Sequence, residues 1–400
     1  MSFQQGLSGL NAAAKALDVT SNNVANTSTV GYKASAAQFQ DVYAASLGGA
    51  GASQIGIGTQ VAQVAQQFTQ GNITITSNPL DIAINGAGFF RMSDNGAITY
   101  TRNGQFLVNK DGYVVNSAGS HLTGYVANAA GIIVPSSPTD ILISNADLVP
   151  NATTTGAIGL NLDSRETTPP AFVYTDPTTY NSSTAMTVYD SLGNSHVMTL
   201  YFRKTAANAW DVYTGLDGNA PGAASGMTFT PAGAVNTGGT LGPLAFAVTT
   251  GANALSITLD LTTATQFGST FGVNSLTQDG YTSGRLSGLS IADNGVIQGR
   301  YSNGQSRDLG QIVLANFANP NGLQSLGGNQ WSETAASGQP LVGEPNSGSL
   351  GALQSAAVEE ANIDLTAELV NMITAQRNYQ ANAQSIKTQD AVMQTLVNLR

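Results

Sequence analysis

The chain has 400 residues, of which only 10% are charged, and its formal net charge is −10 at pH 7. This acidic balance argues against binding to nucleic acid, which requires clustered Lys and Arg. The absence of cysteine excludes disulfides, thiolate metal ligands and cysteine nucleophiles. No run approaches the roughly 18–20 apolar residues of a membrane span, so we predict no membrane insertion.

The first predicted element is an amphipathic helix at the N-terminus. Its apolar residues recur in steps of three and four, the spacing of a coiled-coil seam. The predicted seam consists of Phe3, Leu7, Leu10, Ala14, Leu17 and Val24. The helix should end within residues 22–31, where asparagines compete for backbone hydrogen bonds and Gly31 permits a sharp turn.

The next segment, residues 34–70, is predicted to be a connector without long regular elements, because glycines recur between positions 48 and 58. From residue 71 onward, short β-branched or apolar runs alternate with Asn-Gly and Asp-Gly pairs, a strong β-hairpin signal. Residues 285–360 show the same alternation of short strand-like runs and turn residues. We therefore predict one inner β domain formed by 71–144 and 285–360.

Residues 145–284 are predicted to form a separate, outer β domain inserted into the first. The stretch opens with prolines and contains further hairpin patterns, such as the strand-like runs flanking Ser191–Asn194. Insertions of this kind are tolerated at exposed loop tips, where the chain ends lie close together. The predicted layout is nested, with one β domain inside another.

A short sequence motif of the predicted inner domain recurs about 200 residues further along the chain. Asp94–Ile98 and Arg102–Gln105 are echoed by Asp293–Ile297 and Ser302–Gln305. The echo indicates either shared turn chemistry or an internal repeat.

A second amphipathic helix is predicted at the C-terminus, within residues 361–400. Its seam consists of Leu365, Leu369, Met372, Tyr379, Ile386, Met393 and Val397. The carboxylates Glu359, Glu360, Asp364 and Glu368 fit the positive end of its dipole. Its other positions are rich in neutral amides rather than the Glu–Lys pairs of a helix in bulk water. This pattern indicates that the helix contacts other helices, or that it faces molecules that must pass without sticking to it.

Together these elements predict a mainly β fold with α-helical coiled-coil termini. We expect the nested β domains to be antiparallel barrels or sandwiches, and the terminal segments 1–33 and 361–400 to pack together. The β body provides no obvious partner for the two apolar stripes. The subunit should therefore complete its core with neighbouring subunits.

Residues suited to catalysis are sparse. The two histidines, His121 and His196, each lie beside a turn in strand-like sequence, with no further ligands at metal-site spacing. The acids Asp211, Asp217 and Asp260 could in principle supply a glycosidase pair, but nothing in the sequence pairs them. We predict that the protein is not an enzyme and binds no cofactor.

Two signatures stand at the chain ends. The N-terminal one comprises Asn22, Asn23, Ala25, Asn26, Gly31, Tyr32 and Lys33, and the C-terminal one includes Glu368–Ile373, Ala375–Arg377 and Tyr379. They resemble the signatures of the bacterial flagellar axial proteins, the family of rod, hook and hook-associated proteins. The interior resembles the hook members in Asp81–Ile84, Gly88–Phe90, Arg102–Phe106, Leu122–Tyr125 and Leu309–Phe317.

The resemblance implies a structural subunit of a homopolymeric tube, the curved universal joint between flagellar rod and filament. It implies rod proteins, a hook cap protein, hook–filament junction proteins and the flagellar type III export apparatus as partners, and an extracellular location at the flagellum. Such export uses no cleaved signal peptide, and the N-terminus lacks the basic and apolar regions of one. Because the family's terminal helices line a channel, Gln380, Asn382, Gln384 and Gln394 become candidate channel-facing residues.

Two alternatives remain open. A distal rod protein or another axial protein would share the terminal signatures, although such proteins usually lack an insert as large as 145–284. Outside the family, a secreted β-rich adhesin or carbohydrate-active protein would also fit this composition.

Overall fold

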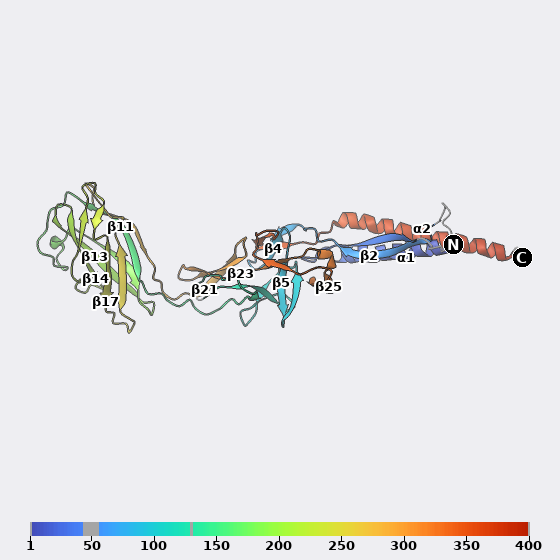
Figure 1. Ribbon diagram of the computed structural model, residues 1–400, viewed down its shortest axis with the longest axis horizontal. Helices are drawn as coiled ribbons and strands as arrows, with labels where there is room; N and C mark the ends of the chain where they lie inside the picture. Colours follow the sequence, from blue (N-terminus) through green and yellow to red (C-terminus); the bar gives the residue numbers. More distant parts are fainter. Residues whose placement is uncertain (1, 43–55, 129–130, 399–400) are drawn as a thin grey trace. The chain divides into compact units, whose positions relative to one another are not determined.

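A computed structural model describes residues 2–42, 56–128 and 131–398. The described residues divide into two compact units (Figure 1). The inner unit comprises Met1–Ser144, Gly288–Arg300 and Ser306–Arg400, and the inserted unit comprises Asn145–Ser287 and Tyr301–Gln305.

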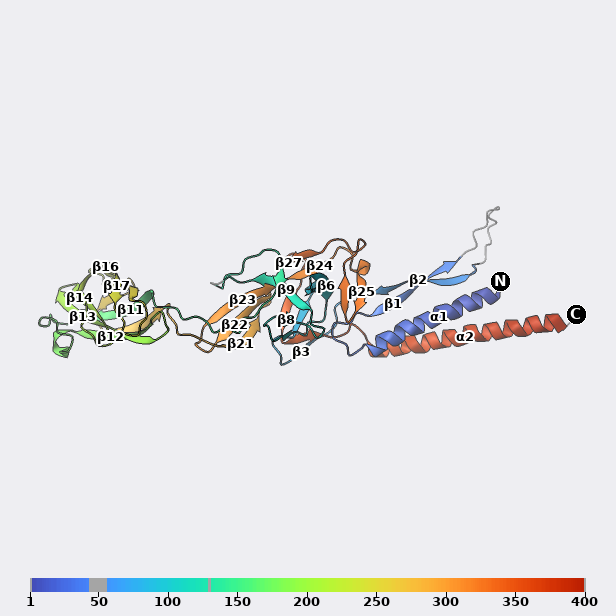
Figure 2. The ribbon, with the colours of Figure 1, turned by 90° about the horizontal axis from the view of Figure 1, so that it is seen from below.

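The predicted fold class is confirmed, because the described chain is mainly β with a helix at each end. Helix α1 (Ser2–Ala25) and helix α2 (Leu365–Asn398) pack side by side (Figure 2). Helix α2 begins after Asp364, whose Oδ1 accepts hydrogen bonds from the backbone N–H of Thr366 (2.8 Å) and Ala367 (3.2 Å). This is the N-cap arrangement that satisfies free donors at a helix start, so the electrostatic interpretation of Asp364 holds.

The expectation of an irregular connector is wrong for its described part, which contains a β-hairpin. Strand β1 (Ser35–Val42) pairs antiparallel with β2 (Gly58–Gln66), and the glycines at 48, 49 and 51 lie outside the described residues. The hairpin packs on α1, where Gln5 Nε2 donates to the carbonyl of Gly56 over 2.6 Å. An isolated hairpin is only marginally stable. The sequence predicted the N-terminal helix but gave no sign that this helix packs against residues 35–42 and 58–66.

A sheet with the strand order β21-β22-β23-β9-β5-β6-β26-β25 forms the body of the inner unit. Its strands are β5 (Phe89–Asp94), β6 (Ala97–Thr101), β9 (His121–Val126), β21 (Leu286–Ile291), β22 (Val296–Tyr301), β23 (Ser306–Ile312), β25 (Gln324–Gly327) and β26 (Gln330–Ser332). Shorter strands attached to it are β7 (Leu107–Val108), β8 (Val114–Val115), β10 (Thr139–Asp140), β24 (Leu314–Asn316) and β27 (Leu341–Gly343). A 3₁₀ turn, Pro320–Gly322, precedes β25.

An aromatic cluster fills the core of this unit. Phe89, Tyr100, Phe317 and Trp331 are each at most 4% exposed, and their rings meet edge to face. Such contacts suit the aromatic quadrupole and stabilise a pair by about 0.5–1.5 kcal/mol beyond area burial. The core therefore joins strands from both halves of the chain.

The two ends of the chain meet again just before α2. Strand β28 (Ala352–Ser355) pairs with β4 (Ile82–Asn85), and β29 (Ala357–Glu359) pairs with β3 (Ile73–Ile75). These antiparallel pairs bring the start of α2 next to the end of the hairpin segment.

The inserted unit is a sandwich of two sheets. One has the order β12-β13-β14-β15-β16, and the other β17-β18-β11-β19, with β20 also paired to β11. The strands are β11 (Thr155–Asp163), β12 (Ser182–Tyr189), β13 (Ser195–Ala206), β14 (Ala209–Leu216), β15 (Ser225–Phe229), β16 (Val235–Thr237), β17 (Thr240–Phe246), β18 (Leu255–Asp260), β19 (Thr265–Phe267) and β20 (Gly272–Gln278). A 3₁₀ turn, Pro177–Thr179, lies between β11 and β12.

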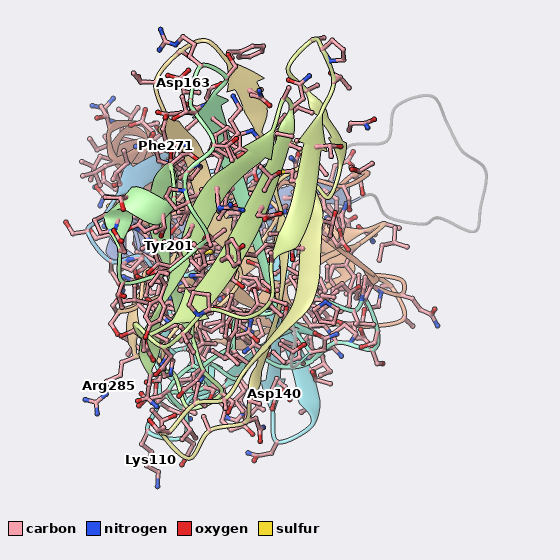
Figure 3. The ribbon with its side chains drawn as sticks, turned by 90° about the vertical axis from the view of Figure 1, so that its left-hand side faces the viewer. Lys110, Asp140, Asp163, Tyr201, Phe271 and Arg285 are labelled. Atoms are coloured by element: carbon pink, nitrogen blue, oxygen red, sulfur yellow. The ribbon has the colours of Figure 1, made fainter. Side chains whose placement is uncertain are left out.

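Both sheets contribute to one core, which includes Leu160, Phe202, Trp210 and Ile257. Figure 3 looks onto this unit, with Tyr201 on β13 labelled. None of the described sheets closes into a barrel, so the sandwich alternative is the correct one. Most strand pairs are antiparallel, as expected, but β11 runs parallel to β18 and β19.

The turn Tyr301–Gln305 belongs to the inserted unit, although the sequence placed it in the inner domain. Asn303 Nδ2 donates to the carbonyl of Thr282 over 2.7 Å, and Ser302 N–H donates to the carbonyl of Arg285 over 2.8 Å. These contacts tie the tip of the β22–β23 hairpin to the chain that leaves the insert.

The repeated phrase does not repeat a backbone conformation. Asn95 (φ 50°) and Gly96 (φ 93°) both adopt positive φ in the β5–β6 turn. In the downstream copy Gly295 has φ 83°, whereas Asn294 does not have positive φ. This difference argues against an internal structural repeat at these two turns.

Candidate assembly surfaces and the helix junction

The contact between the two terminal helices is made by small residues of α1. Gly6, Ala13, Thr20 and Asn23 are buried, and they follow steps of seven, seven and three. A Cβ added to Gly6 would lie 3.0 Å from Ile386 Cγ1 of α2. Gly6, Ala13 and Asn23 each precede a residue of the predicted seam by one position. The buried face of α1 is therefore rotated by one residue from the apolar stripe that the sequence predicted.

The contact is also loosely filled. A groove of about 630 Å³ lies along this face of α1, between α2 and the hairpin. Its walls include Ala13, Ala16, Ala37 and Asn378. Small side chains bury little apolar area, so this contact contributes little hydrophobic stabilisation.

The larger apolar residues of the predicted N-terminal seam remain partly or largely accessible. Phe3 is 52% exposed and Leu7 is 44% exposed, while Leu10, Leu17 and Val24 are half-buried. A sequence that turns small residues inward and large ones outward leaves an apolar stripe on α1. This stripe is a candidate surface for other polypeptides.

The predicted seam on α2 is accessible to a similar degree. Leu365, Leu369, Tyr379, Met393 and Val397 are exposed, whereas Met372 and Ile386 are half-buried. Exposure is greatest near the C-terminus, at 62% for Met393 and 70% for Val397. The structure thus presents an apolar stripe on each terminal helix.

The candidate channel-facing amides divide into two groups. Gln380, Gln384 and Gln394 are exposed. Asn382 is half-buried, and a Cβ added to Gly9 would lie 2.7 Å from its Oδ1. Asn382 therefore faces α1 within the subunit, and which of the four amides face a channel stays a prediction.

The signature residue Asn23 fastens α1 to the hairpin. Its Nδ2 donates to the carbonyl of Ser35 over 2.8 Å, and its Oδ1 accepts from Ser35 N–H over 3.0 Å. The Tyr32 hydroxyl donates to the same Oδ1 over 3.3 Å, and burial raises the pKa of Tyr32. Asn23 Nδ2 also lies 3.4 Å from Glu368 Oε1 of α2.

The other asparagines and Gly31 shape the turn after α1. Asn26 Nδ2 donates to the carbonyl and to Oδ1 of Asn22, each over 2.9 Å, while Ala25 is exposed. Gly31 has φ 71°, and a Cβ there would lie 2.5 Å from Asn103 N. Backbone stands in the way, so this position requires glycine.

Lys33 enters a buried ionic cluster with Glu359 and Arg102. Lys33 Nζ lies 2.6 Å from Glu359 Oε1, and Arg102 Nη1 lies 3.1 Å from Glu359 Oε2. The Lys33 and Glu359 side chains are fully buried and that of Arg102 is 4% exposed. Burial lowers the pKa of Lys33, and Glu359 partly offsets that effect. Glu359 is thus a counterion within β29, which corrects its assignment to the helix dipole.

Sequence reasoning did not identify Arg102 or Glu359 as partners of Lys33. They lie 69 and 326 positions from Lys33 along the chain. The available signal was weak: in a chain with only 14 Lys and Arg residues, a cation beside an Asn-Gly turn is unusual. The small residues of α1 carried a clearer signal, since Gly6, Gly9 and Ala13 share the three- and four-residue steps of a helix face.

The histidines make ordinary protein contacts. His196, 7% exposed at its side chain, lies between Asp217 (Nδ1 to Oδ2, 2.7 Å) and Asp190 (Nε2 to Oδ2, 3.3 Å). His121 Nδ1 lies 2.8 Å from Asp140 Oδ2. Within the described ranges no group of three or more His, Asp or Glu residues could hold a metal ion. Neither α1 nor α2, over their described lengths, is long and apolar enough to cross a membrane.

Family models match successive parts of the chain. Residues 3–33 match the flagella basal body rod protein, 83–149 the flagellar hook protein FlgE/F/G D1 domain, 161–281 the flagellar basal body protein FlaE D2 domain, and 354–399 the flagellar basal body rod FlgEFG protein C-terminal region. With apolar stripes on both terminal helices and a nested β body, these matches define a structural protein of the flagellar axis.

Relatives that match over their whole length specify which flagellar axial family the chain belongs to. The chain is 44% identical over 416 residues to the flagellar hook protein FlgE of Salmonella typhimurium, with 100% of both chains covered. It is 44% identical over 412 residues to that of Escherichia coli, again with 100% of both covered, and 33% identical over 446 residues to that of Borreliella burgdorferi, covering 100% of this chain and 99% of the relative. The chain therefore belongs to the flagellar hook protein FlgE family, whose members are structural proteins and not enzymes.

The fold agrees with this assignment. The crystal structure of Helicobacter pylori flagellar hook protein FlgE2 superposes with a TM-score of 0.53 at 14% sequence identity. The match covers 72% of this chain and 99% of that one. At this identity the likeness shows a shared fold.

Proposed function

We propose that this protein is the repeating subunit of a curved, flexible tube that joins the flagellar rod to the filament and encloses an export channel. The observation that carries the proposal is the pair of apolar stripes on α1 and α2. Exposed apolar surface is costly in water and is removed when it packs against another chain. A homopolymer built on the terminal helices would cover both stripes.

The partners follow from the same proposal. The tube would contact rod proteins at its base and hook–filament junction proteins at its tip, and it would grow beneath a hook cap protein. The subunits would leave the cell through the flagellar type III export apparatus, without a cleaved signal peptide. The domain roles belong here too: segments 1–33 and 361–400 would line the channel, 34–70 would connect, and 145–284 would form the outer layer.

The hook is favoured over a distal rod protein by the inserted unit and by the full-length hook relatives. A secreted adhesin has no support from the family matches.

A charge within the N-terminal stripe tests the proposal. In Leu7→Asp the new carboxylate lies at an exposed position, so the monomer should fold normally, as judged by far-UV circular dichroism. Burial of that unpaired charge against a neighbour would cost several kcal/mol. We expect wild-type protein to form short curved tubes by negative-stain electron microscopy, and Leu7→Asp to form none.

Asn11→Asp is the matched control, because it adds the same charge to an exposed polar position of α1 one turn away. It should form tubes like the wild type. If Leu7→Asp also assembles normally, or if the wild type yields only discrete particles, the helix stripes do not drive assembly.

A further inference from the structure

The cluster around Glu359 joins segments that are far apart along the chain. Glu359 Oε1 accepts from Lys33 Nζ and, over 2.8 Å, from the backbone N–H of Gly71. The Glu359 carbonyl accepts from Gly31 N–H over 2.8 Å. Lys33 Nζ also donates to the carbonyl of Thr69 over 2.7 Å. One carboxylate residue thus connects the end of α1, the base of the hairpin and the start of α2.

Arg102 fixes this residue to the inner unit. Its Nη1 binds Glu359, and its Nη2 donates to the carbonyl of Gly86 over 2.9 Å. The side chain also lies over the ring of Phe89, with Cζ 5.4 Å from the centroid. Because Phe89 belongs to the aromatic core, Arg102 links the ionic cluster to that core.

The helices themselves provide little to hold these segments in place. Small residues of α1, Gly6 and Gly9, lie against α2, and a groove of about 630 Å³ runs beside them. A helix without a packed apolar face is marginal in water. The end of α1 and the start of α2, here called the helix roots, must therefore be held in place by other contacts.

We infer that Lys33, Arg102 and Glu359 form a latch that holds the roots of both terminal helices and the base of the β1–β2 hairpin on the inner unit. The latch keeps these segments in place while the distal parts of α1 and α2 remain free to pair with other chains. It goes beyond the proposed assembly role, and its test requires only the monomer.

The latch has an asymmetry that makes it testable. Two cations share one carboxylate, so Lys33→Met leaves a neutral Arg102–Glu359 pair and retains most of the side-chain volume. The inner unit should therefore stay folded. Glu359→Gln instead leaves two buried cations without a counterion, which is far more disruptive.

The experiment is limited proteolysis of the monomeric full chain with a non-specific protease, with the cut sites identified by mass spectrometry. Cleavage through local opening follows the population of the open form. In wild-type protein we expect the distal helices to be trimmed while residues 31–42 and 56–71 resist. In Lys33→Met, cleavage within 34–42 and 56–70 should accelerate at least about tenfold, the effect of losing one hydrogen bond to a charged group, whereas cleavage after residue 359 should change little. Glu359→Gln should accelerate cleavage on both sides.

Glu360→Gln is the matched control, because Glu360 is the adjacent acid and is exposed; it should leave both rates unchanged. The emission of buried Trp331 reports whether the inner unit is folded. Unchanged cleavage within 34–42 and 56–70 in Lys33→Met overturns the latch. So does loss of the folded Trp331 signal in that variant, since the cluster would then support the whole unit instead of the roots.

Discussion

Protonation of His196 should make the stability of the inserted unit depend on pH. Burial lowers the pKa of His196, but its hydrogen bonds to Asp217 and Asp190 outweigh burial, and the net shift is upward. The pKa of each partner carboxyl is lowered: burial opposes the change, but hydrogen bonds, including those to His196, prevail. All three shifts favour the charged pairings in the folded state.

The directions of these pKa shifts determine the pH range in which the inserted unit is most stable. Because the folded-state pKa of His196 is raised, its contribution to stability is complete below the unfolded pKa of about 6.5 and is lost as pH rises through the folded-state value. The carboxylates have lowered pKa values, so their contribution is present above about pH 4 and is lost in acid. We expect the inserted unit to be most stable between about pH 4 and 6.5.

The size of the effect follows from what remains after His196 is removed. Breaking a buried ion pair can cost about 3–5 kcal/mol, but Asp190 keeps donors from Leu192 N, Asn194 N and Thr250 Oγ1. Asp217 is 43% exposed at its side chain, so solvent screens that contact. We therefore expect His196→Gln to cost about 1.5–3 kcal/mol at pH 5, the value of a hydrogen bond to a charged group, and about 1 kcal/mol at pH 9.

Urea unfolding at pH 5 and pH 9 measures this difference. Trp210 is buried in the same core and reports on the inserted unit in a Trp331→Phe background. His121→Gln is the control, because His121 lies in the inner unit and should leave the Trp210 transition unchanged. An equal cost at both pH values, or a larger cost at pH 9, would refute the assignment of His196 as a charged partner.

Other changes probe the turn, the insert and the channel. Gly31→Ala should destabilise the inner unit by about 1–3 kcal/mol, because positive φ and the Asn103 backbone both oppose a Cβ; a shift in Trp331-monitored thermal unfolding measures it, and no shift contradicts it. Deleting 149–283, whose flanking residues Leu148 and Gly284 are hydrogen-bonded to each other, should leave an exported chain that forms straight or mechanically altered tubes; unchanged curvature by electron microscopy would rule out a role for the insert. Replacing Gln380, Gln384 and Gln394 with Leu should permit tube assembly but slow export of later subunits, as measured by filament growth; unaltered growth, or a tube lumen lined by the seam residues, would overturn the channel assignment.

The sequence was sufficient to predict the mainly β class and the two helices, because hydrophobic period and Asn-Gly pairs report on local structure. It was insufficient for the hairpin at 35–66, whose order depends on packing against α1. The ionic cluster was also beyond reach. Lys33 and Glu359 are separated by 326 positions, with the whole insert between them, and no local pattern encodes that pairing.

The rotation of the helix contact has a physical cause that also bears on assembly. A hydrophobic count gives weight to Leu and Phe and none to Gly, so it finds the stripe through Leu7 and misses the neighbouring face through Gly6 and Ala13. Small residues let two helices approach closely but bury little apolar area. The intrachain contact therefore sets the position of α1 and α2 at low stabilisation, and most of the apolar surface stays available. A subunit that buried its large apolar residues internally would have a more stable monomer and a smaller hydrophobic driving force for polymerisation.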